Sequence, residues 1–391
     1  MVGIITLSFA YVLSQFYRTF LAVLTPVLSN ELGMSEIQLS MASGVWFACF
    51  ALAQFPIGAW LDRYGPRRTA SYMHGLFGAG GIYLFASATS PVHVIIAMGL
   101  IGLGCAPVLM ASYMLLARNY EPAKFATLAS IFIAVGMFGS VVGAEPLAQA
   151  VTLWGWRSVG LVLAVTSLTI SLVILFAVRD PEIVIHEKKG SVLDLLKIRE
   201  LWPLFALITC AYAIPTSIRA LWSGPYLEHV HGLNVPEIGR IVLFLAFGQI
   251  AGTIIYGPLD RIFNTRKWVI TVGNIFLSLT CIWFVLYPDA SLTHATMGLV
   301  ALTIFGATST ILMTHGKSYI PTHMTGRGLT LLNFFSMGGV AIMQFASGFV
   351  VDTYTVSTQP TSAFSALFTF YAVYLTISLV IYQFSKDVKP R

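Results

Sequence analysis

The sequence predicts an all-α membrane protein in which twelve transmembrane helices form two pseudo-symmetric six-helix bundles. The first observation is composition: 57% of the 391 residues are hydrophobic and 10% are charged, whereas soluble domains carry about 25% charged residues. The second is a series of apolar runs long enough to cross a lipid bilayer. The third is a similarity between the two halves of the chain. These observations exclude an ordinary soluble domain.

Twelve apolar runs of membrane-spanning length can be marked along the chain. They cover residues 3–29, 37–61, 69–88, 91–117, 125–149, 156–178, 201–227, 237–258, 268–287, 292–315, 328–352 and 362–384. A polar stretch separates the first six runs from the last six. We therefore expect an N-terminal six-helix bundle at 1–178, a cytoplasmic linker at 179–200 and a C-terminal six-helix bundle at 201–391.

The basic residues are distributed unevenly between the two sides of the predicted membrane. Most of the 22 lysine and arginine residues lie in connections that share a side with both termini and the linker. Because basic residues are enriched on the cytoplasmic side, we expect both termini to be cytoplasmic and the protein to lie in the inner (plasma) membrane of the cell. The net charge of +6 is then a signal of orientation, and it gives no reason to expect a nucleic acid partner.

The two halves of the chain share short motifs at a spacing of about two hundred residues. The stretch "GAWLDRYGPRR" corresponds to "YGPLDRIFNTRK", and "KFATLASIFIAVG" corresponds to "RGLTLLNFFSMGG". A third pair, "AYVLSQFYR" and "AYAIPTSIR", ends in Arg18 and Arg219. Parallel repeats of this kind occur in one large class of transporters. The two arginines therefore hold equivalent positions in the first and seventh runs.

The stretch "GAWLDRYGPRR", residues 58–68, has a glycine, three residues, an aspartate, a base, and then a glycine and two bases. It resembles the loop signature of the major facilitator superfamily, and the predicted spans and repeat extend this resemblance over the whole chain. The resemblance implies that the loop and its second copy switch between conformations. The predicted switch residues are Gly58, Asp62, Arg63, Gly65, Arg67, Arg68, Asp260 and Arg261.

The loop residues have properties that suit a switch. Gly58 would let the second span approach a neighbouring helix closely, and Asp62 is suited to the positive N-terminus of another helix. The repeat makes the span that begins near Arg327 the expected neighbour. The alternative is that the basic residues of this loop only fix the orientation of the chain.

Arg18 and Arg219 are permanent cations within otherwise apolar runs. A charged side chain in a membrane span is costly, and it normally faces a water-filled cavity on a transport path. Two guanidinium groups that face one cavity repel each other unless an anion lies between them, and a carboxylate, phosphate or sulfonate suits their geometry. The alternative is neutralisation by an acid of the protein. Nearly all acids fall in loops or at span ends, and only Glu145 could reach inward.

Helical spacing extends the predicted site around the two arginines, because positions three, four or seven residues away share a helix face. Polar residues of the eighth and eleventh spans are further candidates. The predicted substrate-binding residues are Arg18, Arg219, Tyr11, Ser14, Gln15, Tyr212, Thr216, Trp222, Ser223, Asn333 and Gln249. The aromatic residues could instead pack or anchor helices at the membrane interface, and the amides could instead join helices.

The placement of the two arginines is similar to that in the organophosphate:phosphate antiporters of the superfamily. The stretch "YRTFLAVLTPVLSNELGMS" resembles the first span of its organic-anion symporters. These resemblances imply transport of a small organic anion (a carboxylate, phosphate ester or sulfonate) by alternating access, either by antiport or by symport. For symport, Glu145 and His74 are possible proton carriers.

Other transporters of the same fold remain as alternatives. A proton-coupled multidrug exporter is disfavoured because Met98 stands where many such members have an arginine, four residues before Gly102-Leu103-Gly104. A carrier of neutral solutes, such as sugars or nucleosides, would use its aromatic and amide side chains and leave the arginines with a structural role.

The sequence gives no indication of an enzyme, because it has no nucleophile elbow, no metal-spaced histidine cluster and no phosphate loop after a strand. The four cysteines lie in apolar runs without a CxxC spacing and are expected to be small core residues. We expect no cofactor and no metal. The expected partners are a small anionic substrate and the lipid bilayer, with a monomeric chain.

Overall fold

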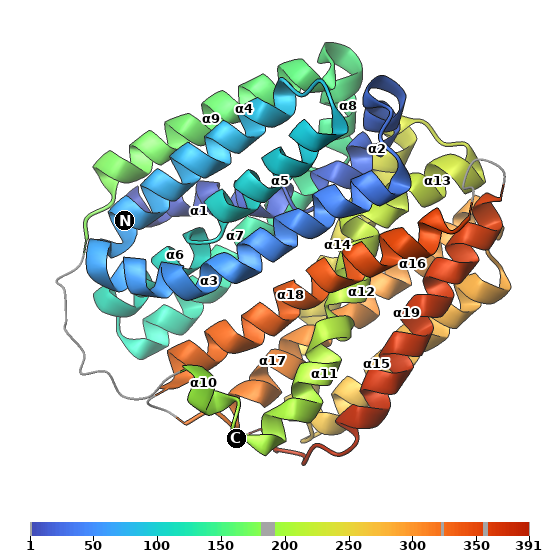
Figure 1. Cartoon of the computed structure of the whole chain (residues 1–391). Coiled ribbons are helices and arrows are strands. Elements are labelled where there is room, and N and C mark those ends of the chain that lie inside the picture. The colour runs from blue at the N-terminus through green and yellow to red at the C-terminus, as the bar shows by residue number, and fades with distance from the viewer. Residues whose placement is uncertain (1, 181–191, 322–323, 355–358, 391) are drawn as a thin grey trace. The chain divides into compact units, whose positions relative to one another are not determined.

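The computed structural model describes residues 2–180, 192–321, 324–354 and 359–390, so much of the predicted linker lies outside the described residues. The regular elements of the described part are helices (Figure 1). The chain divides into two compact units, Met1–His186 with Asn234–Leu243, and Glu187–Leu233 with Phe244–Arg391. Helix α14 (Val235–Ile262) begins in the first unit and continues in the second.

The first unit contains the helices of the first six predicted spans. They are α1 (Val2–Phe16), α2 (Phe20–Leu32), α3 (Glu36–Tyr72), η1 (Met73–Ala79), α4 (Gly80–Ala86), α5 (Pro91–Cys105), α6 (Val108–Asn119), α7 (Pro122–Val142), α8 (Glu145–Trp154) and α9 (Trp156–Ala177). The first predicted span bends by 48° between α1 and α2, and the fifth bends by 41° between α7 and α8. The short element η1 is π-helical.

The second and third predicted spans join at Gly65, inside the long element α3. Gly65 has φ 80° and ψ 164°, a conformation that glycine adopts without steric cost. The next helical turn begins at Pro66, and the backbone N–H of Arg67 donates to the Asp180 carboxylate at 2.8 Å. A Cβ atom at position 65 would overlap that carboxylate. Asp180 follows the sixth predicted span, so it ties the end of that span to the start of the third.

The second unit contains the helices of the last six predicted spans. They are η2 (Arg199–Leu201), α11 (Trp202–Ala211), α12 (Ala213–Ser217), η3 (Ile218–Trp222), α13 (Ser223–His231), most of α14, α15 (Lys267–Leu286), α16 (Leu292–Gly306), α17 (Ser309–Lys317), α18 (Thr325–Asp352) and α19 (Pro360–Tyr382). The short helix α10 (Val192–Leu195) precedes them and lies within the predicted linker. The elements from η2 to α13 form one apolar helical stretch.

The described residues include nine helices that are long and apolar enough to cross a membrane, or up to eleven if each bent pair is one span. This agrees with the predicted all-helical membrane fold. One of the nine, Glu36–Ala86, has 51 residues, whereas about 20 residues suffice to cross a bilayer. The number of twelve stays a prediction.

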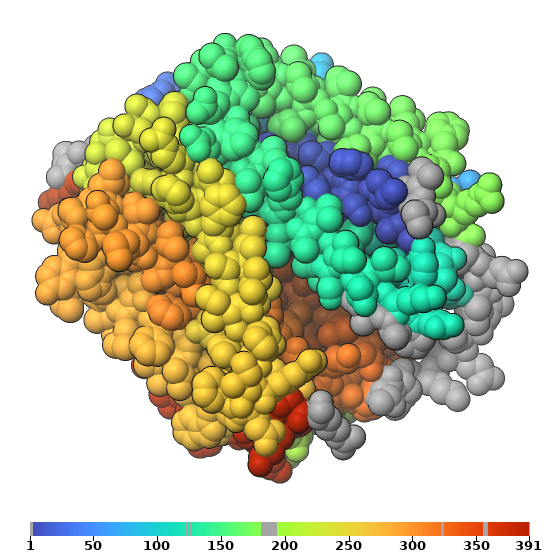
Figure 2. All heavy atoms as spheres, turned by 180° about the vertical axis from the view of Figure 1, so that it is seen from behind, coloured from blue at the N-terminus to red at the C-terminus, as the bar shows by residue number. Residues whose placement is uncertain are grey.

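Helix α1 contacts several other helices of the first unit. It packs against α6, α7 and α9, and in Figure 2 part of it (dark blue) is visible between α7 (teal) and α9 (green). The close approach of α7 depends on glycine, because a Cβ atom at Gly139 would overlap the carbonyl oxygen of Val12. Small residues at such crossings let helix backbones approach each other in membranes.

The second unit repeats the carboxylate contact of the first, with Asp387 after the last predicted span. The Asp387 carboxylate accepts hydrogen bonds from Thr265 Oγ1 at 2.5 Å and from the backbone N–H groups of Arg266 at 3.1 Å and Lys267 at 3.0 Å. Lys267 in turn donates to the carbonyl oxygen of Gln383 at 2.6 Å. An anion at the first turn of α15 also complements the helix dipole.

We expect Asp387→Asn to lower the stability of the protein by about 1 kcal/mol, a small effect because the carboxylate is exposed. Burial acts to raise the pKa of Asp387, but the hydrogen bonds from Thr265, Lys267 and Arg266 outweigh it and hold the pKa below its ordinary value. The stabilisation is therefore present above the ordinary pKa of about 3.9 and is lost as the pH falls through the lower folded-state pKa. Heat unfolding of purified protein at several pH values tests this, with Asp352→Asn as the control. An equal loss at all pH values would contradict the prediction.

Candidate functional site

Arg18 lies at the break between α1 and α2. The helix tightens there, because the N–H groups of Arg18 and Thr19 donate to the carbonyl oxygens of Gln15 and Phe16, three residues earlier, at 3.3 and 3.0 Å. Such 3₁₀ bonds within a helix often mark a hinge or a strained sequence. The arginine is 7% exposed. The first unit therefore buries a permanent cation at the bend of its first predicted span.

The break is supported by α7. A Cβ atom at Gly143 would lie 2.9 Å from Thr19 Oγ1 and 3.1 Å from the carbonyl oxygen of Phe16. Gly143 directly follows α7 as its C-cap, and together with Gly139 of α7 it forms a surface without side chains against which the bent segment packs. The position of Arg18 thus depends on residues more than a hundred positions later in the sequence.

Two aromatic rings of α3 lie beside the Arg18 guanidinium. Its central carbon is 5.5 Å from the centre of the Trp46 ring and 5.0 Å from that of Phe50, within the range of cation–π attraction. The two rings stack on each other, with centroids 5.3 Å apart and an angle of 13° between their planes. Neither residue was among the predicted site residues, because helical spacing identifies only neighbours on the same helix.

Arg219 lies in the π-helical turn η3 of the second unit and is 5% exposed. Single π-helical turns inside longer helices are frequent at functional sites. Helix α18 packs beside this segment, where Gln344 Nε2 donates to the carbonyl oxygen of Ser217 at 3.4 Å. The repeat-equivalent arginines therefore share two properties, burial and a local departure from α-helical geometry.

The predicted residues around Arg18 lie on α1. Tyr11 is 5% exposed and stacks on Phe132 with centroids 5.1 Å apart. Its hydroxyl accepts a hydrogen bond from Gln15 Nε2 at 2.8 Å. Ser14 is 1% exposed. The first unit thus brings all three into the same segment as Arg18, with Tyr11 packed against α7.

The predicted residues of the second unit differ in their surroundings. Trp222 is fully buried, and its Nε1 donates to Ser347 Oγ at 2.8 Å. Thr216 and Ser223 are 2% and 0% exposed. Three others are half-buried, namely Tyr212, Gln249 on α14 and Asn333 on α18. The indole N–H of Trp222 is therefore already used within the protein.

The possible proton carriers have distinct environments in the first unit. Glu145 begins α8, and its Oε1 lies 3.6 Å from Nε of Arg240, whose side chain is 63% exposed. Glu145 thus has an ion-pair partner near the start of α14, apart from the arginines of the apolar spans. His74 is fully buried in η1.

The switch residues of the first unit lie around the Gly65 turn. Arg67 forms an ion pair with Asp180 at 3.3 Å, and the Arg63 guanidinium lies over the Tyr64 ring at 5.3 Å. Asp62 and Arg68 are exposed. A Cβ atom at Gly58 would meet no atom within 4 Å, so within this unit no neighbour requires glycine there.

The repeat-equivalent aspartate in the second unit has a partner. Asp260 is 7% exposed and pairs with Arg266 Nε at 3.2 Å. Arg266 also donates to Ser318 Oγ at 2.6 Å, whereas Arg261 is exposed. Asp260 is thus held inside its own unit, while Asp62 is exposed.

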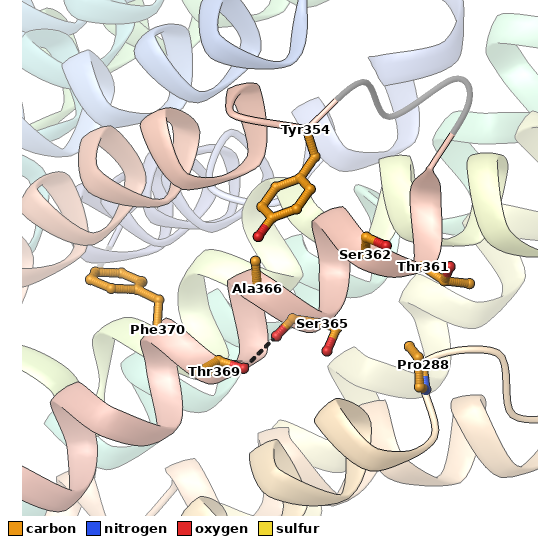
Figure 3. A pocket seen from close by; sticks show the side chains of 8 residues that line it. All are labelled: Pro288, Tyr354, Thr361, Ser362, Ser365, Ala366, Thr369 and Phe370. Atoms are coloured by element: carbon orange, nitrogen blue, oxygen red, sulfur yellow. Dashed lines mark hydrogen bonds between the residues drawn. The ribbon is translucent and has the colours of Figure 1, made fainter.

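A groove of about 680 Å³ lies beside the first half of α19 (Figure 3). It is lined by Pro288, Tyr354, Thr361, Ser362, Ser365, Ala366, Thr369 and Phe370. Thr369 Oγ1 donates to the carbonyl oxygen of Ser365 at 2.8 Å, and Ser365 Oγ donates to that of Val285 at 3.3 Å. The lining carries hydroxyls but no charge, and it includes none of the predicted site residues.

Three comparisons relate the chain to known proteins. It is 24% identical over 387 residues to the sialic acid transporter NanX of Escherichia coli (strain K12), covering 91% of this chain and 89% of that one. It is 23% identical over 390 residues to a probable L-galactonate transporter of the same organism, covering 90% and 83%. A solved bacterial homolog of the human lysosomal transporter Spinster, inward-facing and unoccupied, has a TM-score of 0.74 at 18% identity, covering 97% and 95%.

The relatives are transporters rather than enzymes, in agreement with the sequence prediction. The solved structure, at its low identity, supports the fold alone. The sequence model of the Major Facilitator Superfamily matches residues 7–344, which is most of the chain. The protein is therefore a membrane transporter that belongs to the major facilitator superfamily.

Proposed function

We propose that this transporter carries a small organic anion by alternating access and that Arg18 and Arg219 both bind it. The observation that carries the proposal is the pair of repeat-equivalent arginines, one in each unit, 7% and 5% exposed within apolar helical stretches. A charge buried in a membrane span is costly and is a functional candidate by default. Each arginine also lies where its helix departs from α-helical geometry.

The relatives favour a carboxylate over a phosphate ester or a sulfonate. The two named above are transporters of sialic acid and, probably, of L-galactonate, and both of these compounds are hydroxylated carboxylic acids. A guanidinium group binds a carboxylate through two parallel hydrogen bonds. The proposed substrate is therefore a sugar acid or a similar hydroxycarboxylate.

The remaining parts of the proposal follow the sequence analysis. Twelve spans are proposed because the 51-residue helix Glu36–Ala86 is long enough for two and turns at Gly65. The bacterial relatives support a place in the inner membrane, and the distribution of basic residues supports cytoplasmic termini. The loop around Asp62 is the proposed switch, and Glu145 and His74 are the proposed proton carriers if transport is symport.

A thermal-shift screen tests the substrate class, because a ligand that binds the folded state raises its apparent stability. The panel contains L-galactonate, sialic acid, galactose 6-phosphate, neutral galactose and a cationic dye. We expect the two carboxylates to stabilise the purified protein, by about 2.7 kcal/mol at a hundred times the dissociation constant. Stabilisation by galactose alone would support a neutral-solute carrier, and stabilisation by the dye alone would support a multidrug exporter. Either result would overturn the proposal.

A further inference from the structure

The indole N–H of Trp46 is a buried donor without an acceptor in the described part of the chain. Trp46 is fully buried, and no described residue accepts a hydrogen bond from its Nε1. Most buried polar groups in proteins have a partner, and leaving one without a partner costs free energy. The tryptophan ring is well packed, because it stacks on Phe50 and meets the Phe47 ring edge to face at 4.8 Å between centroids. Packing therefore accounts for the ring but not for the N–H group.

The nearby arginine does not satisfy this donor. Arg18 carries only donors, and its contact with Trp46 is of the cation–π type, at 5.5 Å from the ring centre. Such a contact uses the face of the ring, whereas the N–H bond lies in the ring plane. The guanidinium group over the face of the indole and the N–H at the edge of the same ring are both donors, and together they are complementary to acceptor oxygens.

We propose that Trp46 Nε1 donates a hydrogen bond to an oxygen of the anion bound at Arg18, and that this oxygen is the 2-hydroxyl of a 2-hydroxycarboxylate. The inference rests on the proposed function. A carboxylate occupies the guanidinium group with its two oxygens. The 2-hydroxyl is one carbon away from the carboxylate, so it is the next acceptor that a neighbouring donor meets. Arg18 then binds the carboxylate while Trp46 binds the adjacent hydroxyl.

The same geometry predicts how the transporter discriminates between substrates. A site that is built to hydrogen-bond a substrate hydroxyl rejects the analogue that lacks it, because the buried donor is left without a partner. We expect 2-hydroxycarboxylates to bind at least about tenfold more tightly than the matching carboxylates without the hydroxyl. Trp46 is thus a specificity-determining residue.

The test uses two matched ligand pairs, L-galactonate with its 2-deoxy analogue and lactate with propionate. Dissociation constants are measured with purified full-length protein and with Trp46→Phe, which keeps an aromatic ring for packing on Phe50. We expect the variant to lose the preference for the hydroxylated member of each pair and to bind the other member as well as the original protein does. A variant that keeps the full preference overturns the inference.

Two further measurements separate this role from a structural one. If Trp46 only supported the fold, Trp46→Phe would weaken both members of a pair equally and would lower the melting temperature of the ligand-free protein. Some decrease in melting temperature is expected for either role, because phenylalanine leaves part of the volume of the fully buried indole empty. The decrease is expected to be small because no described hydrogen bond is lost, so the selective loss of the hydroxyl preference is the deciding readout. Trp222→Phe is the matched comparison, and it is expected to lower the melting temperature because it removes the bond to Ser347 Oγ. If no carboxylate binds the original protein, the proposed function itself fails, whereas carboxylates that bind without any preference for the hydroxyl refute the Trp46 inference alone.

Discussion

Replacing Arg18 or Arg219 with glutamine is expected to reduce binding of the proposed organic anion roughly thirty-fold to several-thousand-fold and to abolish its measurable uptake. Removing one partner of a buried, hydrogen-bonded charge pair costs about 2–5 kcal/mol, and each 1.4 kcal/mol is a tenfold change in affinity. Lysine is expected to restore only part of the binding. It keeps the charge but lacks the planar fork that binds a carboxylate with two hydrogen bonds.

Uptake of labelled L-galactonate into proteoliposomes measures this effect, and melting temperature without ligand monitors folding. Arg199→Gln is a matched control, because Arg199 is an exposed arginine at the first residue of the apolar stretch that carries the buried Arg219. It is expected to keep normal uptake. Normal uptake by Arg18→Gln or Arg219→Gln would show that the arginine has a structural role, as in a carrier of neutral solutes.

The all-helical membrane fold could be predicted from the sequence, because the apolar runs, the distribution of charge and the internal repeat can each be recognised from the order of the residues alone. The break at Arg18 does not. The first apolar run, 3–29, continues through residues 17–19 without a proline or glycine at the break. The structure shows that Gly139 of α7 and Gly143, the residue that caps this helix, lie against this segment. That contact joins residues more than a hundred positions apart. A pattern along one helix cannot report it.

The site was predicted only in part for a similar reason. Spacing along a helix identified Tyr11 and Gln15, which do lie next to each other. It could not identify Trp46, which is on another helix and reads in the sequence as one more apolar residue of the second span. Nor could it show that the N–H of Trp222 is bonded to Ser347, because that partner lies more than a hundred residues away. Contacts between helices decide which side chains keep a free donor.

The substitution Gly139→Ala is expected to impair the first unit and Gly339→Ala the second, through the packing of α1 and α11, the helices that precede the two arginines. A Cβ atom at Gly139 would overlap the carbonyl oxygen of Val12 on α1, and one at Gly339 would overlap that of Thr209 on α11. Because the obstacle is backbone rather than a flexible side chain, the helices must separate. Overpacking of this kind costs about 1–3 kcal/mol. The rate of uptake is expected to be more sensitive to this change than the melting temperature, because a shift of about 1 Å in a functional group can cost a hundredfold in rate.

Gly338→Ala is the matched control, because a Cβ atom at this neighbouring glycine of α18 would meet no atom within 4 Å. Alanine also has the higher helix propensity, by about 1 kcal/mol, so this substitution is expected to leave uptake unchanged and to keep or raise the melting temperature. Melting temperature and uptake of labelled L-galactonate, measured on the three variants in parallel, separate close packing from helix propensity. If Gly339→Ala behaves like Gly338→Ala, the contact with Thr209 does not hold α11 in place. The positions of the two arginines would then have to depend on interactions other than these helix crossings.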